Sequence, residues 1–241
     1  MSKKNVVLLW FVWILFYPIM IVSQVTEIMG NGIVAEKSYD VQSFKRIEID
    51  GVFNVFLKQG SVESVKVRTD ENLLDVVEVV KRYDKLIIGI KQGITVKKST
   101  LLDLYITLKD ITSLDFEGVG NVKTLSPLHL DVLSLKVNGI GNVFLNLDCR
   151  RLGASIESVG NVKLKGKATD VVIRHSGVGN LKAFDFIVQN LGIKVSGMGT
   201  VEVRAEHEII IDASGVGNVY YKGAAKVERI TRNGVGKVKH L

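Results

Sequence analysis

Cysteine and proline are both scarce in this chain of 241 residues, which has one cysteine and two prolines. A single cysteine excludes a disulfide framework and any structural zinc site built from several thiolates. With 46% hydrophobic and 24% charged residues, the composition also excludes wholesale disorder. Glycine, by contrast, is abundant, at 23 residues. Because a merely loop-rich chain would be rich in both glycine and proline, glycine alone predicts repeated tight corners.

The first 23 residues have the layout of an export signal. Two lysines at positions 3 and 4 precede an uncharged run from position 6 to 22, and Ser23 offers a small residue at a cleavage point. The run is also near the minimum length for a spanning helix, so an uncleaved membrane anchor is the alternative. Either reading exports the remainder to the periplasm, outer envelope or extracellular space. We expect residues 24–42 to be a linker or N-terminal extension and residues 43–241 to be the folded domain.

A six-residue unit with two glycines recurs seven times in the second half of the chain. It reads EGVGNV at 117–122 and SGVGNV at 214–219, and its second glycine returns every 18 to 21 residues. One copy has Ser158 in place of the first glycine, and DGVFNV at 50–55 is a degenerate copy with Phe53 in place of the second. The corner residues are Gly118, Gly120, Asn121, Gly139, Gly141, Asn142, Gly160, Asn161, Gly177, Gly179, Asn180, Gly197, Gly199, Gly215, Gly217, Asn218, Gly234 and Gly236.

The segments between these corners predict strands. Stretches such as 133–137 and 209–213 are β-branched and largely alternate in polarity, which favours two or three short strands per unit. A unit of about 19 residues is too short for a propeller blade of roughly 40 residues. It suits one coil of a solenoid whose strands stack in parallel about 4.8 Å apart. We therefore expect an all-β parallel β-helix, or β-solenoid, of seven to eight coils; a short-strand antiparallel sandwich is the alternative.

Two columns of side chains should follow from such stacking. The asparagines of the corners could form a ladder of amides, interrupted by Thr200 and Lys237. The apolar residues between the glycines are expected to point inward as a core column; they are Val119, Ile140, Val159, Val178, Met198, Val216 and Val235.

The section before the repeats is different and predicts a cap. Residues 44–69 read as two strands joined at 59–61, and Asp70 is a plausible N-cap for a helical turn at 71–74. Residues 77–82 and 86–90 flank a turn at 83–85 and predict a hairpin. A solenoid needs its ends covered, so this N-terminal capping hairpin segment fits one end. The last strand leaves an open edge at the other end, where self-association is possible.

The motifs do not point to a known chemistry. A dinucleotide site needs a helix after GxGxxG, whereas here another strand follows. Calcium-binding repeats need an aspartate where this chain has Asn, Thr or Lys. The four histidines lie in different units with no metal-ligand spacing. We thus expect no catalytic residue, cofactor or metal, unless the acids Asp170, Asp185, Glu202, Glu206 and Glu208 meet on one face, as in β-helix enzymes that act on polysaccharides.

Lysines follow the repeated motif and suggest a possible basic face. Lys123, Lys163 and Lys182 occupy the same place in their units, as does Lys239, and Lys165 lies nearby together with Lys167 and Lys222. Such a face could attract an acidic glycan or an envelope polymer, although lysines also simply keep a strand surface soluble. No aromatic interleaving is apparent, so we expect no nucleic acid to bind. Cys149 is interpreted as a buried small residue, with a reactive thiol as the alternative.

With these residues in view, the chain resembles a bacterial exported family described as the putative auto-transporter adhesin head GIN domain, a domain of unknown function. The resemblance covers roughly residues 43–238. It depends on the segments 44–47, 51–55 and 70–74, on the hairpin that follows, and on the serial glycine corners. It implies a β-helical, secreted or envelope-associated protein with no assigned enzymatic activity. Our expectation is thus a non-catalytic surface or structural module, with a polysaccharide-binding or polysaccharide-acting protein as the alternative.

Overall fold

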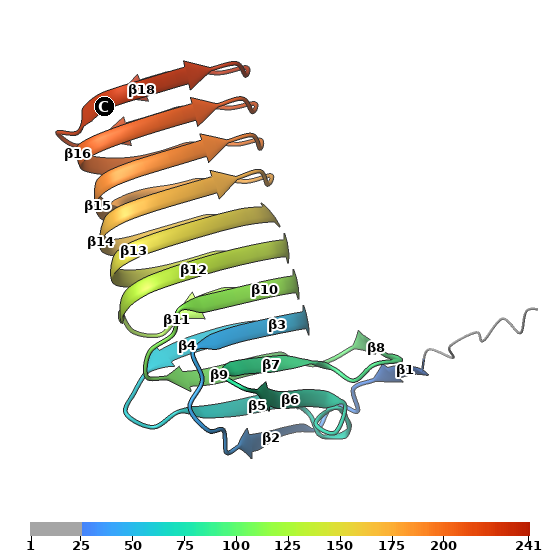
Figure 1. Cartoon of the computed structure of the whole chain (residues 1–241). Helices are drawn as coiled ribbons and strands as arrows, with labels where there is room; N and C mark the ends of the chain where they lie inside the picture. Colours follow the sequence, from blue (N-terminus) through green and yellow to red (C-terminus); the bar gives the residue numbers. More distant parts are fainter. Residues whose placement is uncertain (1–25) are drawn as a thin grey trace, which may run out of the picture.

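Residues 26–241, the part of the chain that the computed structural model describes, form a β-solenoid with a cap at one end (Figure 1). The expected export signal at residues 1–23 lies outside this part. Strands stack in parallel from one coil to the next, as Leu114 opposite Leu135 illustrates, so the predicted β-solenoid is confirmed. Within residues 26–241 no helix is both long and apolar enough to span a bilayer.

The coils follow one another along the rod. The first consists of β3 (Arg46–Val52) and β4 (Asn54–Gln59), and the second of β10 (Ser113–Val119) and β11 (Val122–Thr124). The later strands are β12 (Leu128–Ile140), β13 (Val143–Val159), β14 (Val162–His175), β15 (Leu181–Val195), β16 (Val201–Ala213), β17 (Val219–Lys222), β18 (Lys226–Arg232) and β19 (Val238–His240). We call the strand segments that leave a glycine corner the outgoing sheet, and those that approach the next corner the incoming sheet.

The prediction of two or three short strands per unit is wrong for the middle coils. There, single strands of 13 to 17 residues run around the bend opposite the glycine corner (Figure 1). In β13 the alternation slips at the bend, where Arg150 and Arg151 both point outward between the buried Cys149 and Leu152. Because the parallel ladder resumes immediately after this slip, the chain turns without ending the strand.

The glycine corners are close-packed against each other. A Cβ on Gly139 would lie 1.8 Å from the carbonyl oxygen of Gly118, and one on Gly141 would lie 1.9 Å from that of Gly120. Gly141 also has φ +144, a conformation that other residues rarely adopt. The close approach of neighbouring backbones therefore favours glycine at both positions of the motif, although one coil has Ser158 at the first position.

The expected inward column of apolar residues at these corners is wrong. The side chains point outward and are 43–72% exposed: Val119, Ile140, Val159, Val178, Met198, Val216 and Val235. The reason is strand parity: Phe116 and Gly118 face inward, so Val119 between two glycines must face outward. The core is filled instead by the alternating residues of the strands, such as Leu145 and Leu164.

The asparagines form a continuous ladder outside the corner. Asn121 Oδ1 accepts hydrogen bonds from the backbone N–H of Asn142 at 3.0 Å and from its Nδ2 at 3.1 Å. The same contacts join Asn54 to Asn121, Asn142 to Asn161 and Asn161 to Asn180. At Thr200 only the backbone N–H bond to Asn180 remains.

The cap is inserted between the first and second coils. It contains β5 (Ser64–Asp70), the hairpin of β6 (Val77–Arg82) and β7 (Lys85–Ile90), β8 (Ile94–Lys98) and β9 (Leu102–Leu108). The hairpin is as predicted, and β7 and β9 pair in parallel with β3 and β4 beneath the first coil. Within the expected N-terminal extension, β1 (Thr26–Met29) pairs with β8, and β2 (Val34–Tyr39) pairs with β5.

Asp70 ties the cap together in a way that the sequence did not indicate. It precedes a 3-10 turn at Glu71–Leu73, but its side chain makes no capping hydrogen bond to that turn. Its carboxylate instead accepts hydrogen bonds from the backbone N–H and the hydroxyl of Thr100, both at 2.7 Å, and from the N–H of Gly32 at 2.9 Å. These bonds lower the pKa of Asp70 and keep it ionised.

Candidate binding face

The lysines predicted to form a basic face lie on the outgoing sheet, in the same rows as exposed aromatic residues. In register, Lys123 lies opposite Phe56 of the first coil and Phe144 of the third, and Phe144 lies opposite Lys163. Lys163 then faces Lys182. On the cap side, the ring of Phe56 stacks on Tyr105 with centroids 4.8 Å apart. We call Tyr105, Phe56, Lys123, Phe144, Lys163 and Lys182 the lysine–aromatic strip.

The middle of the strip is a shallow notch of about 360 Å³. Phe144 is 39% exposed, and the ammonium-bearing side chains of Lys123, Lys163 and Lys165 line the notch around it. Lys165 pairs with Asp185 at 3.4 Å, whereas Lys123 and Lys163 have no carboxylate within 4.0 Å among residues 26–241. The notch therefore combines an exposed ring with two cations that the described chain does not neutralise.

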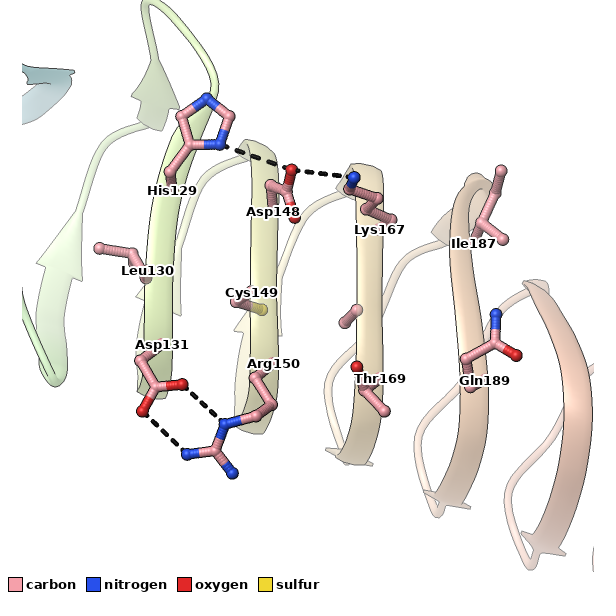
Figure 2. A pocket seen from close by; sticks show the side chains of 11 residues that line it. His129, Leu130, Asp131, Asp148, Cys149, Arg150, Lys167, Thr169, Ile187 and Gln189 are labelled. Carbon is pink, nitrogen blue, oxygen red and sulfur yellow. Dashed lines mark hydrogen bonds and ion pairs between the residues drawn. The ribbon is translucent and has the colours of Figure 1, made fainter.

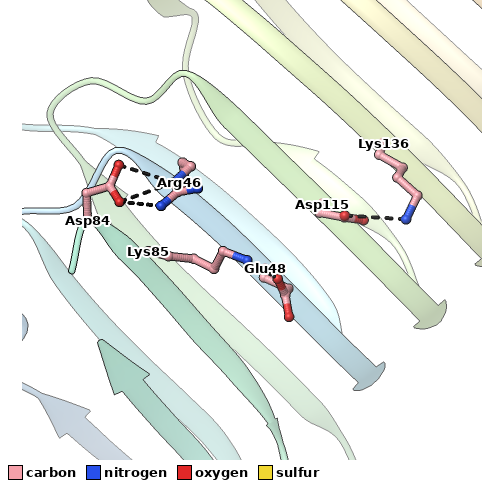
Figure 3. A network of polar contacts seen from close by, with 6 residues as sticks. All are labelled: Arg46, Glu48, Asp84, Lys85, Asp115 and Lys136. Carbon is pink, nitrogen blue, oxygen red and sulfur yellow. Dashed lines mark hydrogen bonds and ion pairs between the residues drawn. The ribbon is translucent and has the colours of Figure 1, made fainter. Parts of the chain in front are cut away.

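The incoming sheet shows the opposite arrangement. Near the cap its charges alternate across the strands and neutralise each other (Figure 3): Lys85 contacts Glu48 at 2.6 Å, and Lys136 contacts Asp115 at 3.4 Å. Arg46 and Asp84 complete this network with a two-pronged ion pair. Near the cap, the cations of the incoming sheet are therefore matched by carboxylates, in contrast to Lys123 and Lys163 of the strip.

The aromatic residues of the strip correct the expectation that no aromatics interleave with the lysines. They could have been found from the repeat, because Phe56, Phe144 and Tyr220 each follow the Asn-Val pair of their unit, as Lys123 and Lys163 do. Aligning only the lysines hides this pattern. Lys167 and Lys222 do not join the strip: Lys167 pairs with Asp148, and Lys222 lies 4.4 Å from the ring centre of Phe184.

A second hollow, of about 810 Å³, lies at the bend opposite the glycine corners (Figure 2). Asp148 contacts His129 at 3.5 Å and Lys167 at 3.4 Å along one side. Along the other side, both oxygens of Asp131 accept hydrogen bonds from Arg150, at 2.7 and 2.8 Å. We call this hollow the bend groove.

Cys149 lies in the floor of the bend groove but is itself buried. Burial, with a smaller contribution from Asp148, raises the pKa of its thiol to about 11. The thiol therefore stays protonated at neutral pH and is a poor nucleophile. This confirms the interpretation of Cys149 as a buried small residue.

The five acids considered for catalysis do not meet in one place. They are dispersed into separate contacts: Asp170 with Arg151 at 3.8 Å, Asp185 with Lys165, Glu206 with Arg204 at 2.6 Å, and Glu208 with His207 at 3.9 Å. Glu202 lies in register with Lys182. Among residues 26–241, no three metal-ligating side chains come together.

Comparison with known proteins identifies similar structures and a family. Residues 43–225 match the family described as "Putative auto-transporter adhesin, head GIN domain". A putative adhesin from Bacteroides fragilis is 25% identical, with a TM-score of 0.83, covering 89% of this chain and 100% of its own. Two further structures share the fold. A putative adhesin from Parabacteroides merdae is 23% identical, with a TM-score of 0.64, covering 89% of this chain and 99% of its own. A putative lipid binding protein from Parabacteroides distasonis is 19% identical, with a TM-score of 0.68, covering 89% of this chain and 100% of its own. No curated protein matches the chain.

Proposed function

The chain belongs to the family described as putative auto-transporter adhesin, head GIN domain, and on this basis we propose that it is an exported, non-catalytic surface module. We further propose that it binds an acidic polysaccharide. The observation that carries this proposal is the exposed ring of Phe144 between Lys123 and Lys163, two cations without a carboxylate partner in the described part of the chain. The family supports a surface or exported location. The proposed ligand class and the proposed binding site are inferred from the side chains of the lysine–aromatic strip.

An acidic sugar chain matches both kinds of group on the strip. The ring of Phe144 can pack against the C–H face of a sugar, and the lysines can pair with its carboxylate or sulfate groups. Lys123 and Lys163 are two coils apart, so their spacing is roughly 10 Å along the rod. A polymer that lies along the rod would meet these groups in sequence, whereas a small anion would meet only one of them.

The charged groups of the bend groove support binding rather than hydrolysis. Glycoside hydrolysis needs a carboxylic acid that is protonated at working pH. Arg150 holds the pKa of Asp131 below its usual range, so this acid stays ionised and engaged. Asp148 already contacts two cationic side chains, His129 when protonated and Lys167.

The test is binding of the purified protein to alginate, polygalacturonate and dextran sulfate, with neutral dextran and oligo-dT as comparisons. The combined change Lys123→Gln, Phe144→Ser and Lys163→Gln is expected to weaken binding to at least one acidic polysaccharide by about tenfold or more. Affinity should also fall as salt rises from 0.05 to 0.5 M, because the attraction is screened.

The matched control changes two cations on the opposite sheet. Arg174→Gln with Lys194→Gln alters the net charge by the same amount at two exposed, adjacent positions of the incoming sheet, and should leave the affinity unchanged. If both variants lost the same amount of affinity, the effect would come from net charge alone, and specific binding by the lysine–aromatic strip would be contradicted. Binding of oligo-dT in preference to every polysaccharide would replace the proposed ligand with single-stranded nucleic acid.

A further inference from the structure

We propose that the bend groove is a second binding site, which takes a neutral, hydroxyl-rich sugar chain. This proposal does not depend on the lysine–aromatic strip. The groove crosses four coils, because its side chains come from β12, β13, β14 and β15 at the same bend (Figure 2). At about 810 Å³ it is the size of a ligand site rather than a gap between side chains.

The charges of the groove cancel, which distinguishes it from the strip. Asp131 and Asp148 are matched by Arg150 and Lys167, each within ion-pair distance of an acid. A polyanion would have to compete with these carboxylates, and a polycation with the two bases. A neutral ligand avoids both penalties and can use the hydrogen-bonding capacity that the ion pairs leave free.

The polar groups alternate in the way that sugar hydroxyls require. Carboxylate oxygens accept hydrogen bonds, and the outer N–H groups of Arg150 and the ammonium of Lys167 donate them. Thr169 and Gln189 extend the row on the Arg150 side across the next two coils, and both are exposed. Because a hydroxyl both donates and accepts, neighbouring donors and acceptors at coil spacing suit a chain of hydroxyls.

The floor and one end of the groove are apolar. Leu130 and Ala168 lie beneath the polar rows, and Ile187, 39% exposed, lies beside Lys167 in the next coil. Apolar surface beside ordered polar groups matches a sugar ring, which has C–H faces and a polar rim.

The groove is fixed in place before any ligand arrives. Gln59 of the first coil donates from Nε2 to the carbonyl of His129 at 2.9 Å and accepts from its backbone N–H at 2.8 Å. The two-pronged Asp131–Arg150 pair fixes the opposite side. Such preorganisation lowers the conformational entropy that binding costs.

The experiment measures binding of the purified protein to neutral hexasaccharides: α- and β-linked glucans, mannan, xylan and N-acetylglucosamine oligomers. At least one is expected to bind with a dissociation constant of about 1 mM or tighter. The double variant Asp131→Ala with Arg150→Ala, which removes the pair as a unit, should weaken that binding by about tenfold. Thr169→Arg, which narrows the groove and keeps both ion pairs, should weaken it similarly.

The matched control is Arg46→Ala with Asp84→Ala, which removes another two-pronged pair outside the groove (Figure 3), whose arginine is about as exposed as Arg150. It should leave hexasaccharide binding unchanged. Failure of every hexasaccharide to bind at 5 mM would overturn the proposal, as would binding that persists in both groove variants. The groove variants should leave the binding of acidic polysaccharide unaffected. The proposals for the strip and for the groove are therefore tested independently of each other.

Discussion

Replacing Gly141 with alanine is expected to lower the free energy of unfolding by about 3 kcal/mol or more. The new Cβ would lie 1.9 Å from the carbonyl oxygen of Gly120, and φ at this position is +144. To relieve this clash the two neighbouring coils would have to separate, which would break the parallel hydrogen bonds between them on both sides of the corner. In a chain of this size such a loss lowers the melting temperature by roughly 6 °C or more, which thermal unfolding followed by circular dichroism would detect.

Gly153 provides the matched control within the next coil. It lies in β13 with an ordinary extended backbone, and nothing lies within 4 Å of the Cβ that alanine would add. Gly153→Ala should therefore leave stability unchanged or raise it by roughly 0.5 kcal/mol, because glycine is unfavourable inside a strand. A Gly141→Ala protein as stable as the Gly153→Ala protein would show that close backbone packing does not explain the repeated glycines.

The repeat predicts the solenoid because stacked strands force equivalent residues into columns. The degenerate copy at 50–55 fits the same rule: Gly51 lies in register with Gly118, and Phe53 is buried where later units have a glycine. The length of a unit therefore determines which residues stack. For this reason the spacing of the glycine corners alone was enough to predict the β-solenoid.

Direction of side chains was harder to predict than stacking. Val119 is apolar and repeated, which suggests burial, yet it lies one residue after the inward-facing Gly118 and therefore points outward. Polarity favours burial at this position and parity favours exposure, and parity decides the outcome. Counting back from the buried Val122 in steps of two gives the same outward direction for Val119.

The bend groove could not be predicted because its residues keep no fixed distance from the glycines. His129 follows its second corner glycine by 9 residues, Asp148 and Lys167 by 7, and Ile187 by 8. The distance for His129 changes between Lys123 and Leu128, where the pairing with β13 moves by two residues. The distance for Ile187 changes at the register shift between β14 and β15, after Lys163. The strip lies close to the corner, before such shifts accumulate, and so its columns remain visible in the sequence.

A buried histidine should make stability depend on pH. His175 is 2% exposed and lies in register between Ile156 and Val195, and neither ring nitrogen has a hydrogen-bond partner among residues 26–241. Burial lowers the pKa of His175, and the nearby backbone of Gly179 offsets only part of this. The unfolded chain, with an ordinary histidine pKa near 6.5, therefore takes up a proton first as the pH falls.

The sign of the effect follows from that difference in proton uptake. Stability from this site is full above about pH 6.5 and falls as the pH drops, until the folded protein also becomes protonated at His175. His175→Ile removes the unpartnered nitrogens and resembles the neighbouring coils. It should raise the free energy of unfolding by about 1–2 kcal/mol at pH 7 and flatten its dependence between pH 6.5 and 5.

Urea unfolding at pH 7.5, 6.5, 5.5 and 5.0 separates this effect from general acid destabilisation. His207 is exposed and bonded to Asn190 through Nδ1, so His207→Gln should keep the pH dependence of the unaltered protein. If His175→Ile and His207→Gln lost stability equally on acidification, the pH dependence would come from other groups, such as paired carboxylates. A flattened curve for His175→Ile alone would identify the buried imidazole of His175 as the acid-sensitive point of the rod.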